Sequence, residues 1–216
     1  MRISISLAAA AFLASSASVT AIPVQLDASA ACPAVELISA RGTTEPQIPG
    51  SYVLNRGPLA AIARQVPNTA IYNVVYPADT DFNTGPIIGA NDLLARLNSR
   101  IVACPSTKFV LAGFSQGAMV VQRALPQIPT AAASKITAVI MFGNPNFDAS
   151  GPCADGTAKG RGHRGTPIPA EWQPKLRDYC NSGDPVCAGG SNWLVHAAYG
   201  NGAAANKAVS FVVSLL

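Results

Sequence analysis

The stretch KFVLAGFSQGAMVVQRAL, residues 108–125, decides the fold of this chain. Its apolar start, residues 108–112, predicts a buried strand, and residues 116–125 have the pattern of a helix. Between them stands Gly-Phe-Ser-Gln-Gly, residues 113–117, with a single serine between its glycines. A tight strand-to-helix turn crowds the backbone two residues on either side of the serine, and glycine relieves that crowding. The pattern therefore predicts a turn that presents the hydroxyl of Ser115.

A Gly-x-Ser-x-Gly sequence is typical of a nucleophile elbow, in which the serine is exposed at the carboxyl end of a parallel sheet. The following helix supplies backbone N–H groups and the positive end of its dipole near a developing oxyanion. The alternative is an ordinary glycine turn. Because this motif lies between an apolar strand and an apolar helix, the elbow is favoured and Ser115 is the candidate nucleophile.

The alternation of strands and helices extends along the rest of the chain. Strands are predicted at Val35–Ala40, 70–76, 108–112, Ile136–Phe142 and 176–179, and helices at Pro58–Gln65, 87–102, 116–125 and 203–216. Continuous apolar strands that alternate with helices indicate a parallel sheet covered on both faces. We therefore predict a single α/β domain with about five parallel strands. Residues 144–171 are rich in Gly and Pro and should form a long surface loop.

The length and composition exclude several classes of protein. A chain of 216 residues suits one sizeable domain. Hydrophobic residues make up 49% and charged residues 12%, which argues against disorder. The net charge of +4 is spread without a run of Lys or Arg, so no nucleic-acid partner is expected. The sequence holds no CxxC pair and no His/Cys cluster, so no structural zinc site is expected.

Residues 1–21 have the pattern of a secretory signal peptide. Arg2 precedes a short, alanine-rich apolar run, and cleavage is expected after Ala21, with Ala30 as the alternative. A membrane anchor is disfavoured because serines interrupt a run that is too short to span a bilayer. We therefore expect a secreted, extracellular protein without a stable membrane anchor, whose folded domain spans residues 32–216.

The chain contains five cysteines, and a secreted protein keeps disulfides. They are Cys32, Cys104, Cys153, Cys180 and Cys187. An odd number leaves one cysteine free or paired with another chain. Cys180 and Cys187 bracket a turn-rich loop and are candidates for a short disulfide, whereas spacing alone leaves the other pairings open.

A serine hydroxyl needs a general base, and the chain has two histidines, His163 and His196. In elbow-type folds the order along the chain is serine, acid, histidine. His196 follows the cysteine-bracketed loop with Asp184 at its centre, so these two are favoured as base and acid. The alternatives are a loop histidine bonded to the backbone and an ordinary Asp-Pro turn. Asp178, the other candidate acid, is expected to face solvent.

Stabilising an oxyanion requires two hydrogen-bond donors. One is expected from the N–H of the residue after the nucleophile, Gln116. The other should come from the loop after an early strand, where Thr43 could offer both its N–H and its hydroxyl. The alternative, that residues 41–46 form only a polar turn, remains open from these residues alone.

Four stretches of the chain together resemble the cutinase family. They are ARGTTE (40–45), GFSQG (113–117), CNSGDPVC (180–187) and HAAYG (196–200). The likeness runs from about Cys32 to Val213. It implies a small α/β-hydrolase fold without a large lid that cleaves esters and needs no metal or cofactor. It also implies that Ser115 is the nucleophile, His196 the base and Asp184 the acid.

The same resemblance implies roles for further residues. Thr43 and Gln116 would supply the oxyanion donors. The implied disulfides are Cys32–Cys104 and Cys180–Cys187, which leaves Cys153 as a free thiol or a site of dimerisation.

The predicted function is that of a secreted serine esterase acting on aliphatic or polymeric esters, as cutinases do. An acetylxylan esterase and a non-catalytic protein that binds cell walls are the alternatives. Trp193, Leu194 and Val195 are expected either to contact the acyl chain or to pack in the core. We expect a monomer whose partner is the ester substrate.

Overall fold

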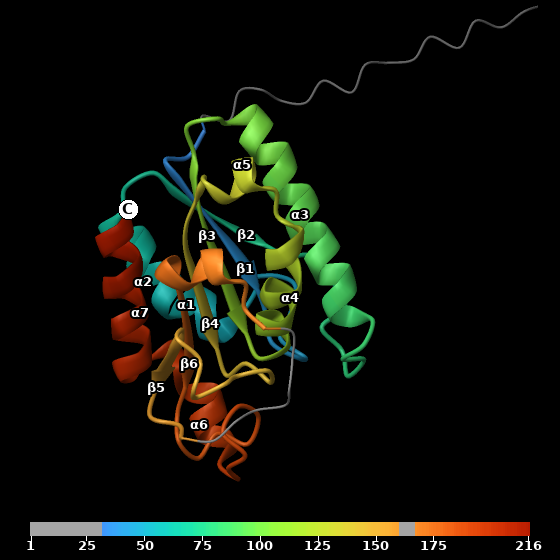
Figure 1. The fold of residues 1–216 in the computed structure, drawn as a ribbon, viewed down its shortest axis with the longest axis vertical. Helices are drawn as coiled ribbons and strands as arrows, with labels where there is room; N and C mark the ends of the chain where they lie inside the picture. Colours follow the sequence, from blue (N-terminus) through green and yellow to red (C-terminus); the bar gives the residue numbers. More distant parts are fainter. Residues whose placement is uncertain (1–31, 160–166) are drawn as a thin grey trace, which may run out of the picture. The chain divides into compact units, whose positions relative to one another are not determined.

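The computed structural model describes residues 32–159 and 167–216, which form an α/β domain (Figure 1). Its six strands form one sheet in the order β2-β1-β3-β4-β6-β5, and every neighbouring pair is parallel. The strands are β1 Val35–Ala40, β2 Thr69–Asn73, β3 Lys108–Phe114, β4 Ile136–Phe142, β5 Ala154–Gly156 and β6 Leu176–Cys180.

Helices precede or follow most of these strands. The α-helices are α1 Tyr52–Arg56, α2 Pro58–Gln65, α3 Gly85–Ala103, α4 Gln116–Ala124, α5 Thr130–Ala133, α6 Trp193–Ala197 and α7 Gly202–Leu215. Three short 3-10 helices complete the set: η1 Leu125–Gln127, η2 Ala170–Lys175 and η3 Ala198–Gly200.

Two apolar cores lie on the two faces of the sheet. Side chains of a strand alternate between its faces, and β3 shows this directly. Phe109 and Leu111 belong to the core formed with α3 and α4, whereas Val110 and Ala112 belong to the core formed with α2 and α7. In Figure 1, α3 and α4 lie on one side of the sheet and α2 and α7 on the other. Burial on both faces explains why these strands are continuously apolar.

The predicted α/β class and the parallel sheet are confirmed, although the sheet has six strands rather than about five. The missed strand, β5, has only three residues and lies within the segment 144–171, which was predicted to be a loop. Such a short strand, in a stretch rich in Gly and Pro, carries no apolar periodicity of its own.

The prediction that Asp178 faces solvent is wrong, because only 3% of this residue is exposed. Side chains of a strand point to the faces of the sheet, and Asn144 contacts Asp178 there, while β5 pairs with the outer edge of β6. The Nδ2 group of Asn144 donates a hydrogen bond to Oδ2 of Asp178 at 2.9 Å, while Oδ1 is buried without a hydrogen-bond partner. Burial raises the pKa of Asp178 to about 7, and the Asn144 hydrogen bond opposes the shift.

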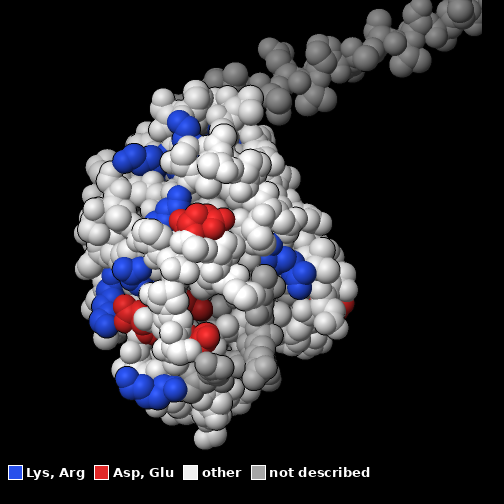
Figure 2. All heavy atoms as spheres, in the orientation of Figure 1, with Lys and Arg blue, Asp and Glu red and all other residues white. Residues whose placement is uncertain are grey.

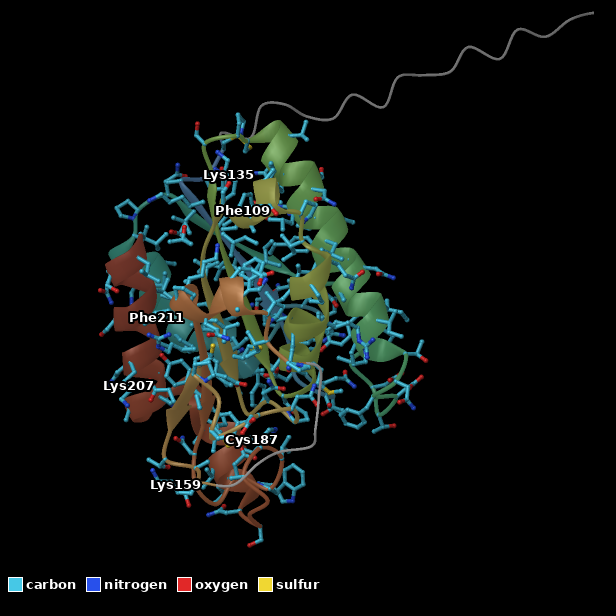
Figure 3. All side chains as sticks on the ribbon, in the orientation of Figure 1. Phe109, Lys135, Lys159, Cys187, Lys207 and Phe211 are labelled. Carbon is cyan, nitrogen blue, oxygen red and sulfur yellow. A yellow bond between two sulfur atoms is a disulfide. The ribbon has the colours of Figure 1, made fainter. Side chains whose placement is uncertain are left out.

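Two disulfides hold the ends of secondary structure elements. Cys32–Cys104 joins the start of the described chain to the end of α3, and Cys180–Cys187 joins the end of β6 to the loop that follows it. Cys153 is free and buried. Figure 3 labels Phe109 near the start of β3 and Cys187 at the opposite end of the sheet, beside α6.

Two further features bear on partners. None of the helices in 32–159 and 167–216 is both long and apolar enough to cross a membrane. The face drawn in Figure 2 carries Lys and Arg interspersed with Asp and Glu on a largely uncharged surface. The predicted signal peptide, residues 1–21, lies outside the described residues.

Candidate active site

Ser115 occupies a sharp turn between β3 and α4, and its φ of 54° is rare for a residue with a side chain. The turn is held by the N–H of Ser115, which donates to the carbonyl of Phe142 at 2.8 Å. The flanking glycines are needed for space. A Cβ on Gly113 would lie 2.4 Å from the carbonyl oxygen of Gly117, and one on Gly117 would lie 2.0 Å from that of Ala40. The Gly-x-Ser-x-Gly spacing is therefore a steric requirement of this turn.

Three side chains form a continuous chain of hydrogen bonds at this end of the sheet. His196 Nε2 lies 3.0 Å from Ser115 Oγ, and His196 Nδ1 lies 2.9 Å from Asp184 Oδ2. Their exposed fractions are 7% for Ser115, 8% for His196 and 0% for Asp184. The serine and the imidazole are thus reachable from solvent, whereas the carboxylate is sealed behind the imidazole.

Short local structures hold the candidate base and the candidate acid in place. His196 lies on α6, whose first turn is capped by Asn192, since its Oδ1 accepts the N–H of Leu194 at 3.0 Å. Asp184 lies between the two cysteines of the Cys180–Cys187 disulfide. Its Oδ1 accepts the N–H groups of Val186 at 2.7 Å and Cys187 at 3.2 Å. The bracketed loop therefore folds around the carboxylate.

Tyr199 is a fourth member of this arrangement that the sequence reasoning missed. Its hydroxyl donates to Asp184 Oδ2 at 2.8 Å and accepts the N–H of Asn181 at 2.9 Å, and the residue is fully buried. Tyr199 stands three residues after His196, and this helical spacing would have placed both on one face.

Asp184 is held in its ionised form. Burial raises its pKa, but the hydrogen bonds from His196, Tyr199 and the N–H of Val186, together with the charge of His196, outweigh burial. The net effect is a pKa below the ordinary value of an aspartate. Burial raises the pKa of Tyr199 well above its ordinary value, so its hydroxyl keeps the proton that it donates.

Donors for an oxyanion flank Ser115. Gln116 is the first residue of α4, where the helix offers its N–H no acceptor. Across the site, the Oγ1 of Thr43 is buried and has no hydrogen-bond partner. An unpartnered buried hydroxyl is costly in a folded protein. Its position therefore suits a group that binds a substrate atom.

Arg41 and Glu45 hold the loop that carries Thr43, and the sequence reasoning assigned neither a role. The guanidinium of Arg41 donates to four carbonyl oxygens, those of Glu45, Val74, Tyr76 and Pro77, at 2.5–3.3 Å. The Glu45 carboxylate accepts the N–H groups of Gly42 at 2.6 Å and Val53 at 3.1 Å. The loop is thus fixed from both of its ends before any substrate arrives.

A cavity of about 1150 Å³ opens at Ser115 and His196. Much of its lining is apolar, including Phe82, Met119, Val186 and Trp193. Of the three residues expected near an acyl chain, Trp193 lines the cavity.

Leu194 and Val195 are not part of that lining, and Leu194 is exposed. His163, the alternative base, lies outside the described residues. Within 32–159 and 167–216, no group of three or more His, Cys, Asp or Glu side chains is arranged to hold a metal ion.

Comparisons with known proteins identify the family of this chain. The family model for Cutinase matches residues 31–216. Phospholipase Culp4 of Mycobacterium tuberculosis is 37% identical over 221 residues, which cover 97% of this chain and 90% of the relative. A cutinase of Monilinia fructicola is 33% identical over 184 residues, 82% of each chain.

A solved structure shows the same likeness in three dimensions. The catalytic core domain of acetyl xylan esterase from Trichoderma reesei has a TM-score of 0.78 at 28% identity and covers 86% of this chain and 100% of its own. The chain therefore belongs to the cutinase family and is a carboxylic ester hydrolase.

Proposed function

We propose that this protein hydrolyses esters through a Ser115–His196–Asp184 triad. The observation that carries the proposal is the unbroken hydrogen-bond chain from Asp184 through His196 to Ser115, which opens into an apolar cavity. A buried carboxylate, an imidazole and a serine that lines the cavity, joined in this order, meet the geometric requirement for an activated nucleophile.

In the proposed reaction, His196 takes the proton of Ser115 as the hydroxyl attacks the ester carbonyl. Asp184 holds the imidazole in the required tautomer and stabilises the imidazolium. The N–H groups of Gln116 and Thr43 and the Thr43 hydroxyl bind the oxyanion. His196 then returns its proton to the leaving alcohol. Water, activated by the same imidazole, releases the acid and regenerates Ser115.

Two features support Asp184, rather than Asp178, as the acid. Asp184 carries four donors on its two oxygens, including Tyr199 and His196. Asp178 instead accepts a hydrogen bond from Asn144, which lies just after the end of β4. We assign Tyr199 as a positioning residue that holds the Asp184 carboxylate toward His196.

The cavity favours aliphatic acyl groups longer than acetyl. Its volume of about 1150 Å³ far exceeds what an acetyl group fills, and Phe82, Met119 and Val186 give it apolar surface. An acetyl esterase acting on polysaccharides is the second candidate, since a similar structure bears that activity in its name. Rates on p-nitrophenyl acetate, butyrate and octanoate separate the two. Butyrate or octanoate should match or exceed acetate, and a sharp preference for acetate would favour the polysaccharide esterase.

A covalent probe tests the nucleophile. An alkyl phosphonate should label the protein once per chain, and peptide mass spectrometry should place the label on Ser115. Labelling of another serine would refute the triad. The absence of both labelling and ester turnover would favour a non-catalytic protein that uses the same fold for binding.

We propose that the protein is secreted. The support is the signal-like pattern of residues 1–21 and the presence of two disulfides, which persist in oxidising compartments. N-terminal sequencing of protein collected from the medium should show cleavage after Ala21 or Ala30, and retention of the intact leader would contradict it.

A further inference from the structure

Four consecutive backbone carbonyl oxygens of a short segment after β2 accept hydrogen bonds from residues at the oxyanion site. This segment, residues 76–79, is here called the bridging segment. The guanidinium of Arg41 donates to its first two carbonyl oxygens at 2.5 and 3.0 Å. The N–H of Thr44 donates to the third at 2.7 Å, and the Nε2 group of Gln116 donates to the fourth at 2.8 Å. The bridging segment therefore contacts both sides of the oxyanion site.

The donors to the bridging segment lie directly beside the two expected oxyanion donors. Thr44 follows Thr43 in the chain, and Gln116 follows the candidate nucleophile Ser115. The bridging segment thus links the loop after β1 to the first residue of α4. Thr44 and Ala78, which share a hydrogen bond, have φ values of 65° and 51°, and surrounding contacts must stabilise such left-handed residues. The separation of the two oxyanion donors therefore depends on contacts with the bridging segment.

The side-chain amide of Gln116 is buried with half of its polar atoms unused. Gln116 is 0% exposed, and its Oε1 has no hydrogen-bond partner within 32–159 and 167–216. Burying an amide oxygen without a partner is costly, and an apolar side chain of similar length would avoid that cost. The interaction that requires an amide here is the hydrogen bond from Nε2 to the carbonyl oxygen of Asp79.

We propose that the side chain of Gln116 is a positioning group that sets the separation of the two oxyanion donors. By holding the last carbonyl of the bridging segment, it ties the N–H of its own residue to the loop that carries Thr43. The amide touches neither the ester nor the oxyanion. It acts through the placement of the backbone N–H groups and of the Thr43 hydroxyl. Such donors must lie about 3 Å from the oxyanion, so a small displacement weakens their effect.

This inference rests on the proposed function and adds a positioning residue to the same site. The oxyanion forms only when the ester carbonyl is attacked, so loss of the Gln116 amide should lower kcat rather than raise KM. The loss should also depend on Thr43, because a hydroxyl that has moved away from the oxyanion contributes less. A purely structural role of Gln116 would produce neither effect.

The experiment is a double-mutant cycle on the hydrolysis of p-nitrophenyl butyrate. Gln116→Met keeps the length of the side chain and removes its donor. It should lower kcat about tenfold and leave KM within about twofold of the wild type. Thr43→Ala should lower kcat about 10²-fold in the wild type, but less than about tenfold in Gln116→Met. Circular dichroism and labelling of Ser115 by an alkyl phosphonate check that each variant is folded.

Gln122→Met is the matched control for Gln116→Met. Gln122 is a buried glutamine of the same helix, and its Oε1 accepts a hydrogen bond from Asn144 at 3.0 Å. In the Gln122→Met background, Thr43→Ala should still lower kcat about 10²-fold.

Gln116→Glu tests the hydrogen bond itself. A neutral glutamic acid can donate to the Asp79 carbonyl oxygen, whereas a carboxylate cannot. The kcat of Gln116→Glu, divided by that of Gln116→Met, should therefore rise as pH is lowered. Titration of His196 affects both variants and cancels in this ratio.

Four outcomes would overturn the inference while leaving the triad intact. The first is an equal cost of Thr43→Ala in the wild type and in Gln116→Met. The second is an unchanged kcat with a raised KM in Gln116→Met, which would confine Gln116 to holding Phe82 and Asn83 in the cavity lining. The others are a reduced cost of Thr43→Ala in Gln122→Met and a ratio for Gln116→Glu that does not change with pH.

Ser115→Ala, tested on the same ester, reports on the proposed function separately. If that variant keeps its activity, the triad fails whatever Gln116 does.

Discussion

The hydroxyl of Tyr199 donates a hydrogen bond at 2.8 Å to Oδ2 of Asp184, the same oxygen that lies 2.9 Å from His196 Nδ1. Two donors therefore converge on one carboxylate oxygen, while the N–H groups of Val186 and Cys187 converge on the other. Because each oxygen of the Asp184 carboxylate has two hydrogen-bond partners, the carboxylate cannot rotate freely. His196 Nδ1 therefore faces an acceptor in a fixed position.

Tyr199→Phe should lower kcat about three- to tenfold with little change in KM, because substrate contacts are untouched. The Tyr199 hydrogen bond helps to lower the pKa of Asp184, so the variant's Asp184 should protonate at higher pH. The acidic limb of the kcat profile should move to higher pH accordingly. Steady-state kinetics across pH measure both effects.

Tyr179→Phe is the control for that substitution. Tyr179 is a buried tyrosine that stacks on Phe142, and its hydroxyl makes no hydrogen bond within the described residues. Its variant should keep the wild-type pH profile. Parallel shifts in both variants would show that Tyr199 acts only through general packing.

Thr43→Ala should separate activity from stability. The hydroxyl has no partner in the free protein, so its removal should leave the free energy of unfolding unchanged or slightly higher. The value of kcat should fall by about 10²-fold if the hydroxyl binds the oxyanion. Thr43→Ser should restore most of the rate. A stability loss without a rate loss would contradict the assigned role.

Asp178 should make the protein less stable as pH rises. Its folded-state pKa of about 7 lies above the ordinary value of 3.8, so the folded state binds a proton that the unfolded chain has released. Stability from this group is therefore full below pH 4 and is lost as pH rises through about 7. Asp178→Asn should gain stability relative to the wild type between pH 5 and 8, on the order of a few kcal/mol.

Denaturation midpoints of Asp178→Asn and the wild type, compared at pH 5 and at pH 8, measure this gain in stability. Asp155→Asn is the control, since Asp155 forms a partly exposed ion pair with Lys207 at 2.9 Å. Its effect should be small and nearly equal at both pH values. A difference between Asp178→Asn and the wild type that does not grow with pH would contradict the burial argument.

Cys153 should be unreactive in the folded protein. It is free and only 2% exposed, and burial raises the pKa of its thiol. A thiol reagent should therefore detect no thiol in the native protein and one thiol per chain in denaturant without reductant. Rapid native labelling, or a dimer linked through Cys153, would show that the residue is accessible.

The elbow and the triad candidates could be predicted because their requirements are local. Gly113 and Gly117 are demanded by contacts within a few residues of Ser115 or with the adjacent strand. His196 was chosen from two histidines by chain order. Asp184 was chosen because it lies between Cys180 and Cys187, and the structure brings it to His196.

Features that depend on contacts between distant segments could not be predicted in this way. Asp178 is buried beside Asn144, which precedes it by 34 residues in the chain and donates a hydrogen bond to its carboxylate. Arg41 holds the loop that carries Thr43 by donating to the carbonyl oxygens of Val74 and Tyr76, which lie just after β2 and more than 30 residues away in the chain. The rotation of α6 about its axis decides which of its side chains line the cavity. Of residues 193–196, Trp193 and His196 line it.

The central claim is that Ser115 is the nucleophile of an esterase, and hydrolysis of p-nitrophenyl butyrate by Ser115→Ala tests it most directly. We expect kcat/KM to fall by at least about 10⁴-fold, with an unchanged circular dichroism spectrum and an unchanged thermal midpoint. A folded variant that retains activity within tenfold of the wild type would contradict the claim.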